Sequence, residues 1–243
     1  MLLGDLTWTD LDPDSGSAPA RTLVVPVGSV EQHGPHLPLD TDVRVATAVA
    51  TGVHDGDRSL VLAPALSYGA AGEHEGFPGT VSLGHEALRA VLVEYGRSAC
   101  RWASRLVLVN GHGGNVATLI EAVTLLRHEG RDAGWIPCVP ARADADGIPL
   151  DAHAGRVETS LMLALAPQLV RTDAAAPGAT GPLRDLLEPM RTGGVAAVSP
   201  NGVLGDPSGA SAQEGRRLLD GMVAATSDAL RCWEPDVDTG RLR

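Results

Sequence analysis

Five side chains that can bind a metal ion follow the apolar residues 24–28. They are one glutamate, two histidines and two aspartates: Glu31, His33, His36, Asp40 and Asp42. Imidazoles and carboxylates are the usual ligands of Zn²⁺ and Fe²⁺ or Mn²⁺ in proteins. Five such side chains directly after an apolar strand predict a metal site where that strand ends, with all five as candidates.

The spacing within this segment favours some of the candidates. Glu31 and His33 are two residues apart, so in an extended segment both side chains point to the same side. Asp42 follows nine residues after His33, beyond a loop that contains Pro35 and Pro38. A loop that folds back would bring Asp42 beside the other two.

A further histidine lies at the end of another apolar segment. His112 sits in NGHGGN (residues 110–115), directly after RLVLV (residues 105–109). Glycines permit a tight turn and close backbone approach, although GHGG alone could equally be a turn that presents amides to an anion. Taken with the first segment, His112 predicts a mixed oxygen and nitrogen ligand set.

Apolar segments of strand length alternate with segments of helical periodicity. Strands are expected at 22–28, 59–66, 105–109 and 133–139, and helices at 41–54, 85–104, 116–126, 153–165 and 210–232. This alternation predicts an α/β fold with three layers, α/β/α, around a mostly parallel sheet. Ligand sites of such folds lie at the carboxyl ends of the strands, where the acidic and histidine-bearing segments follow.

The rest of the chain is less patterned. We expect a loose N-terminal arm (1–21), a single domain (22–232) and a C-terminal tail (233–243). Residues 171–192 lack a clear pattern, and 193–206 resemble a connector or short hairpin. The long loop 67–84 carries Glu73, His74 and Glu75, and loops of this length are usually functional or disordered. Asp40 or Thr41 is a plausible helix cap.

Composition excludes several classes of function. The net charge of −11 argues against a nucleic-acid partner or an anionic membrane surface. No apolar run reaches the ~18 residues that a membrane span needs, and no signal peptide is apparent. Three separated cysteines predict reduced thiols and a cytoplasmic location. Cys138 is disfavoured as a nucleophile because nothing near it in the sequence would activate it.

Four blocks of the sequence resemble the creatininase family of metal-dependent amidohydrolases. They are GSVEQHGPHLPLDTD (28–42), FPGT (77–80), NGHGGN (110–115) and HAGRVETS (153–160), in the family's order. The resemblance covers roughly residues 22–230. It implies a creatininase-like fold and two divalent metal ions per subunit, Fe²⁺ and/or Zn²⁺, with Mn²⁺ as a further candidate.

The resemblance also implies how the ligands are divided. Glu31 and His112 would bind one metal and His33 the other, with Asp42 bridging both. Creatininase supplies one more glutamate two residues after the histidine of its GHG motif, and here that position is Gly114.

Glu158 is the best substitute for the ligand missing at Gly114. Alternatively it is only a carboxylate at a helix N-terminus.

The resemblance also implies the chemistry: two bridged cations would lower the pKa of a shared water, and the hydroxide formed would attack an amide carbonyl. His153 is the candidate acid that protonates the leaving amine. Glu158 is expected to be a second catalytic residue. His74 and Glu75 could shape the pocket, while His36 would lie behind the ligands.

The resemblance is strongest to family members that act on a peptide. This resemblance rests on residues 198–215, on the short length of the chain and on Gly114. It implies a peptidase that releases the C-terminal, dipeptide-derived part of a modified precursor peptide. Residues 144–151 offer no aromatic side chain where creatininase closes its pocket with tryptophans. The alternatives are a small-molecule amidohydrolase (creatinine or a formamide) and a binding module without catalysis. Family resemblance implies a homo-oligomer, expected to be a hexamer.

Overall fold

A four-stranded sheet forms the centre of the molecule. The computed structural model describes residues 1–12, 21–140 and 151–243. The strands are β1 (Thr22–Val27), β2 (Val61–Leu62), β3 (Arg105–Asn110) and β4 (Ala133–Pro137), all parallel and in the order β2-β1-β3-β4. The inner strands β1 and β3 are almost wholly buried and apolar, as expected of parallel strands covered on both faces.

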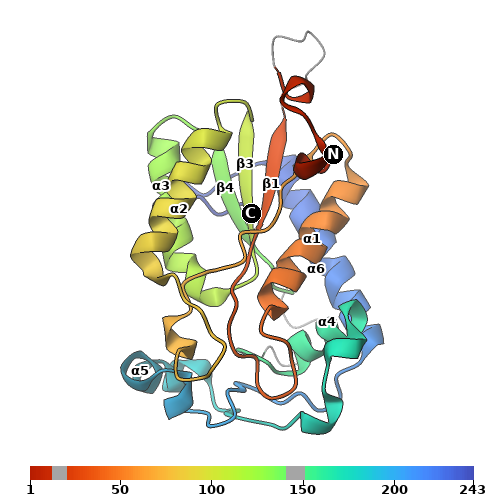
Figure 1. Cartoon of the computed structure of the whole chain (residues 1–243), viewed down its shortest axis with the longest axis vertical. Helices are drawn as coiled ribbons and strands as arrows, with labels where there is room; N and C mark the ends of the chain where they lie inside the picture. Colours follow the sequence, from red (N-terminus) through yellow and green to blue (C-terminus); the bar gives the residue numbers. More distant parts are fainter. Residues whose placement is uncertain (13–20, 141–150) are drawn as a thin grey trace.

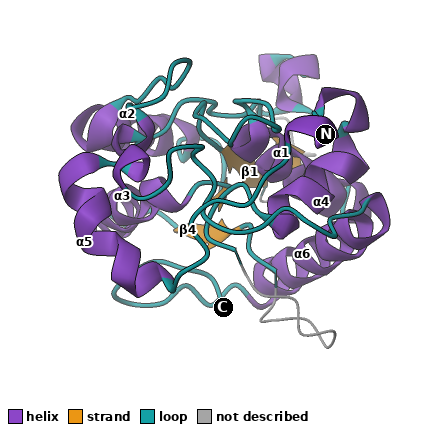
Figure 2. Cartoon of the chain, turned by 90° about the horizontal axis from the view of Figure 1, so that it is seen from below, coloured by secondary structure: helices purple, strands orange, loops and turns teal. Residues whose placement is uncertain are grey.

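Helices cover both faces of this sheet. They are α1 (Thr41–Gly56), α2 (Gly84–Ala99), α3 (Val116–His128), α4 (Arg156–Leu165) and α6 (Ala212–Cys232). A further helix, α5 (Leu183–Gly193), packs mainly against two 3-10 helices instead. Helices α2 and α3 pack on one face, and α1, α4 and α6 on the other (Figures 1 and 2). The predicted three-layer α/β/α architecture with a parallel sheet is confirmed.

Short 3-10 helices lie in the connecting segments. They are η1 (Leu3–Asp5), η2 (Trp8–Asp10), η4 (Gly72–His74), η5 (Gly113–Asn115), η6 (Pro167–Leu169), η7 (Thr172–Ala174) and η8 (Val195–Ala197). The segments after β1 and β3 leave the same edge of the sheet, because parallel strands end on one side. Figure 2 looks onto this edge, where loops cover the strand ends.

Three expectations about helices differ from the structure. The helix expected at 85–104 ends at Ala99. Helix α4 begins at Arg156 rather than near residue 153, because Ala154 adopts a left-handed backbone conformation (φ 52°) that no α-helix contains. Helix α5 lies in the stretch that showed no clear pattern. It contains Pro189, which weakens its helical pattern.

The two ends of the chain are more ordered than expected. Residues 1–12 were expected to form part of a loose arm, but Leu2 bridges to Leu62, and Leu3 and Leu6 pack against the core. Residues 13–20 of that arm lie outside the described part. At the other end, Arg241 bridges to Trp135 and Leu242 is buried, so this segment is part of the packed structure. None of the described helices combines the length and apolarity that a membrane crossing requires.

Candidate metal centre

The segment after β1 carries two buried ligand candidates and folds back on itself. Glu31 and His33 are both fully buried. The Glu31 N–H donates to the Leu39 carbonyl oxygen at 2.9 Å, which closes the loop and brings the start of α1 against the strand end. Gly28 permits this approach, since a Cβ there would lie 2.6 Å from the backbone nitrogen of Val43.

Asp42, in the first turn of α1, lies between two histidines. Its Oδ1 lies 3.1 Å from His33 Nε2, and its Oδ2 lies 3.2 Å from His112 Nδ1. The same nitrogen of His112 is 3.2 Å from Glu31 Oε2. The expected folding-back of the loop, and the convergence of the two strand ends, therefore occur in the structure.

Backbone carbonyls hold the outer nitrogen of both histidines. His33 donates its Nδ1–H to the Glu31 carbonyl oxygen at 3.1 Å, and His112 donates its Nε2–H to the Ala70 carbonyl oxygen at 3.0 Å. A carbonyl oxygen can only accept, so the outer nitrogens carry the protons. In the neutral imidazoles the inner nitrogens would then carry the lone pairs, as in metal-binding histidines.

Glu158 completes the second group of ligand candidates. It lies in the first turn of α4, with Oε2 at 3.9 Å from His33 Nε2, and it accepts a hydrogen bond from the Ala154 N–H. The backbone turn at Ala154 thus fixes both Glu158 and the preceding His153. A non-glycine residue with φ of 52° is strained, and such strain gathers at functional sites.

The arrangement fits two metal ions. Ligand atoms of Glu31, Asp42 and His112 lie within 4.8 Å of one another, and so do those of His33, Asp42 and Glu158. Both carboxylate oxygens of Glu31, and Oδ2 of Asp42, are buried without a hydrogen-bond partner. A buried carboxylate without partners is costly, and a bound cation would remove that cost. These two groups share Asp42. Ligand atoms of Glu31, His33 and His153 also lie within 4.8 Å of one another, as a third, overlapping group.

The charges of the cluster shift the pKa values of its members. Burial alone would lower the pKa of His33, but the carboxylates of Asp42, Glu158 and Glu31 outweigh it and raise that pKa to about 10. Burial raises the pKa of Glu158 to about 7, and it also raises that of Glu31. Burial opposes ionisation of Asp42 as well, yet His33 and His112 keep its pKa below the ordinary value. Without metal, the centre therefore retains protons that cations would displace.

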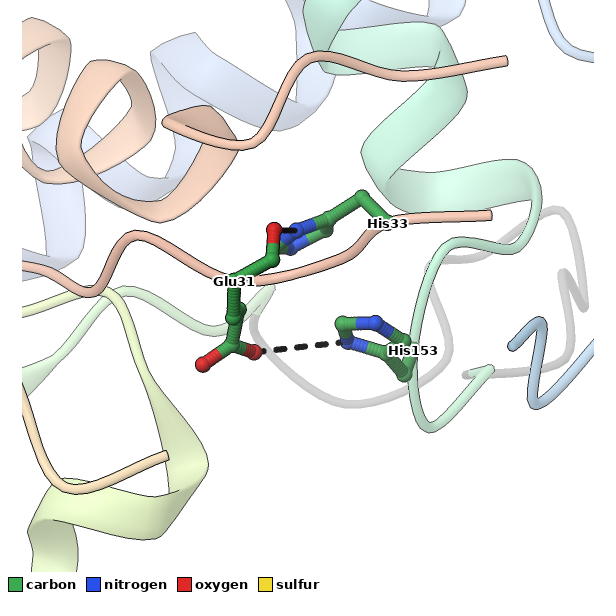
Figure 3. Close-up of side chains that lie close together, drawn as sticks. All are labelled: Glu31, His33 and His153. Atoms are coloured by element: carbon green, nitrogen blue, oxygen red, sulfur yellow. Dashed lines mark hydrogen bonds and ion pairs between the residues drawn. The ribbon is translucent and has the colours of Figure 1, made fainter. Parts of the chain in front are cut away.

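His153 lies on the opposite side of Glu31 from His112. Figure 3 shows Glu31, His33 and His153 together: His153 Nδ1 is 3.8 Å from Glu31 Oε1, and the rings of His33 and His153 are 4.3 Å apart. His153 donates its Nε2–H to the Gln32 carbonyl oxygen at 2.7 Å. Burial and the positive charges of His33 and His74 hold the pKa of His153 well below its ordinary value.

Gln32 was not singled out from the sequence, although it joins three segments of the site. Its Nε2 donates to His74 Nδ1 at 2.8 Å and to the Gly202 carbonyl oxygen at 3.0 Å. His74 then turns Nε2 toward Glu31 Oε1, at 3.3 Å. The only signal in the sequence was the position of Gln32 between two ligand candidates.

The remaining candidates lie outside the two groups of ligands. His36 is buried and its Nε2 is 2.9 Å from Thr159 Oγ1, behind the centre. Asp40 makes no cap hydrogen bond and pairs with Arg44 instead, so its expected capping role is not observed. Glu75 is exposed. Burial raises the pKa of the Cys138 thiol, which disfavours a nucleophilic thiolate.

Gly114 lies against His112, and a side chain there would collide with its neighbours. A Cβ would overlap the Ala70 carbonyl oxygen and His112 Nε2, and it would lie 2.6 Å from Glu73 Oε1. Glu73 Oε1 is also 3.8 Å from His112 Nε2. Glu73 was not expected from the sequence to have a role, because it lies in the 67–84 loop, far along the chain from His112.

Comparisons with known proteins give a consistent set of similarities. A family model described as "Creatininase: Creatinine amidohydrolase" matches residues 4–230. A mycofactocin precursor peptide peptidase from Mycolicibacterium smegmatis (strain ATCC 700084 / mc(2)155) is 57% identical over 219 residues, 88% of this chain and 86% of that protein. A creatinine amidohydrolase from Pseudomonas putida is 34% identical over 260 residues, 95% of this chain and 96% of that protein.

Solved structures agree in fold. One described as "Creatininase Mn" has a TM-score of 0.80 at 31% identity, covering 97% of this chain and 99% of the other. A mutant creatininase of "Zn-Zn type" has a TM-score of 0.80 at 32% identity, covering 97% and 98%. These similarities extend over the whole α/β/α architecture.

Proposed function

The chain belongs to the creatininase family, and on that basis we propose that it is a metal-dependent peptidase that cleaves the modified mycofactocin precursor peptide. The bond cut is the amide that joins the C-terminal, dipeptide-derived part to the rest of the peptide. The observation that carries this proposal is 57% identity, over 88% of the chain, to a protein of that name. Similarity to the Pseudomonas putida creatinine amidohydrolase is much lower, at 34% identity.

We propose that two divalent ions bind at the centre, Fe²⁺ and/or Zn²⁺, with Mn²⁺ as a further candidate. Glu31, Asp42 and His112 would hold one ion, and His33, Asp42 and Glu158 the other. The buried carboxylate oxygens without hydrogen bonds support this assignment, and so do the outer N–H groups of both histidines, which leave the inner nitrogens to face the centre. When bound, such ions activate water and polarise an amide carbonyl. Metal analysis of the purified protein tests both the number and the identity of the ions.

We propose that His153 moves protons during the reaction. Its Nε2–H is committed to the Gln32 carbonyl, so Nδ1 is the free nitrogen, and it faces the centre beside Glu31. With its low pKa, this imidazole starts neutral. It would therefore accept a proton at Nδ1 as the attacking water is deprotonated and then deliver it to the leaving amine. In this proposal His153 would act first as a base and then as the acid expected from the sequence.

We also propose a cytoplasmic homo-oligomer, a hexamer by family resemblance, without nucleic-acid or membrane partners. Light scattering of the purified protein measures its assembly directly. Hydrolysis of creatinine or of a formamide remains the second candidate activity, supported by the 34% identity to a creatinine amidohydrolase.

One experiment decides between the two substrates. The metal-loaded protein is incubated with the modified precursor peptide, the unmodified peptide or creatinine, and the masses of the products are measured by mass spectrometry. We expect the modified peptide alone to be split into a long N-terminal peptide and a small C-terminal piece. An unchanged peptide mass together with conversion of creatinine to creatine would refute the peptidase and establish the alternative.

A further inference from the structure

Two cavities meet at the candidate metal centre. One has a volume of about 270 Å³ and the other of about 350 Å³. Asp42, His153 and Glu158 line both of them. A substrate amide held at these three residues therefore has a separate cavity available on either side.

The smaller cavity, called the apolar cavity from here on, lies among α1, α4, α6 and the segment that follows β4. Away from the metal centre its walls are mainly aliphatic, with one thioether and one thiol: Val45, Val139, Pro140, Val157, Leu161, Met222 and Cys138. An apolar group that binds against such a lining is stabilised by ~25 cal/mol for each Å² of apolar surface removed from water. Asp151 also lines this cavity, but its carboxylate already accepts from the backbone N–H groups of Arg156 and Asp206. The cavity therefore offers a charged group little to replace water.

The larger cavity, called the open cleft, lies on the other side of the centre, toward η4 and α5. Glu73 and His74 come from the first of these helices, and Leu187 and Met190 from the second. The open cleft is less enclosed than the apolar cavity. A long peptide can leave it into solvent.

We propose that the apolar cavity binds the small C-terminal part of the substrate as an uncharged, apolar group, while the remaining peptide lies in the open cleft. This inference rests on the proposed peptidase function. A short terminal piece fits an enclosed cavity of about 270 Å³, close to the lower end of the ~300–1,000 Å³ typical of ligand sites. The rest of a peptide cannot be enclosed and must reach solvent. The cavity thereby limits how much chain follows the scissile bond, which accounts for cleavage near an end.

The methionines of the protein provide reporters for each cavity. The chain has four; Met222 lines the apolar cavity and Met190 the open cleft. We would label the methionine methyl groups with ¹³C and titrate the metal-free protein with N-acetyltyramine, a neutral amide that carries an aromatic group. We expect the Met222 signal to shift with saturation and the Met190 signal to stay. The proposal is overturned if the Met190 signal shifts, with or without a shift of Met222. It is also overturned if neither signal shifts.

A variant shows that the shift comes from the apolar cavity. Met222 also borders a surface cavity near the C-terminus, whereas Cys138 lines the apolar cavity alone. Cys138→Phe should fill the apolar cavity and abolish the Met222 shift. The milder Cys138→Leu, with folding verified by circular dichroism, should weaken it. The matched control is Cys232→Phe, on the exposed end of α6, which should keep the shift. Retention of the shift in both Cys138 variants would refute the placement.

A kinetic measurement separates this inference from the proposed function. In the metal-loaded protein, Cys138→Phe should reduce kcat/KM for the precursor peptide by about tenfold or more, mainly through KM, as expected when a pocket can no longer hold its group. Cys232→Phe should match the wild type. Cleavage of the precursor without any shift of Met222 would refute the cavity assignment alone. A saturable shift of Met222 without cleavage would refute the peptidase and leave the apolar binding site standing.

Discussion

His153 Nε2 lies 2.7 Å from the backbone carbonyl oxygen of Gln32 and donates its proton to it. This contact decides which nitrogen of His153 is free, because a carbonyl cannot donate. The free nitrogen, Nδ1, faces Glu31. The backbone of Gln32 thus orients His153, the residue proposed to carry the proton. The side-chain amide of Gln32 orients His74.

His153→Ala should lower turnover by ~10²–10⁴-fold, the usual contribution of a positioned proton-transfer group. Metal content should stay at the wild-type level, since His153 is not among the proposed ligands. Turnover is measured on the precursor peptide and metal by plasma mass spectrometry. His128→Ala, on the exposed end of α3, is the control. Loss of metal from the His153 variant would show that it is a ligand instead.

Asp42→Asn should remove both metal ions, because Asp42 belongs to both groups of ligands. Glu158→Gln should remove only the ion on the His33 side, because the group of Glu31, Asp42 and His112 stays intact. The retained metal is counted after dialysis against a weak chelator. Equal loss in the two variants would mean that Glu158 does not belong to a separate ion.

The metal-free protein should become less stable as the pH rises from 7 to 10. The pKa of His33 is raised to about 10 in the fold, from an ordinary 6.5, so the folded state binds this proton more tightly. The stabilisation is complete below pH 6.5 and is lost as the pH approaches 10. Thermal melts in chelator should show this decline.

The variant His33→Gln, which has no such proton to lose, should give a flatter profile than the wild type over the same pH range. A melting temperature that rises with pH in the wild type would contradict the assignment. Binding of metal at pH 7 should also release protons, which calorimetry in buffers of different ionisation enthalpy detects.

Gly114→Ala should weaken metal binding, since a Cβ there overlaps the Ala70 carbonyl and His112 Nε2 and would displace the imidazole. Gly113→Ala is the matched control, because a Cβ at Gly113 meets nothing within 4 Å. We expect a clear fall in metal affinity for the first variant and little change for the second. Similar affinities would show that His112 can shift without loss.

Much of this arrangement could be predicted from the sequence. The apolar strands β1 and β3 determine where their polar continuations emerge, so the proximity of Glu31, His33 and His112 follows from parallel pairing. The position of Asp42 beside Glu31 and His33 was expected from the loop with two prolines between them. The loop folds back in this way because Glu31 and Leu39 share a backbone hydrogen bond.

Other features depend on contacts that no local pattern encodes. Helix α5 is polar and contains Pro189, and it packs chiefly against short 3-10 helices. The tautomers of the histidines depend on carbonyl groups of Ala70 and Gln32. The N-terminal residues pack on the core through scattered leucines rather than through a periodic stripe.

The shared carboxylate of Asp42 joins segments that are distant in the chain. Ligand candidates come from the end of β1, the start of α1, the end of β3 and the start of α4. Two ions held there would act as cross-links that close long loops of the polypeptide, and the entropy of an unfolded chain falls when such loops are closed. Both metal ions would therefore bind late in folding, because their ligands come together only after all four segments have taken their places.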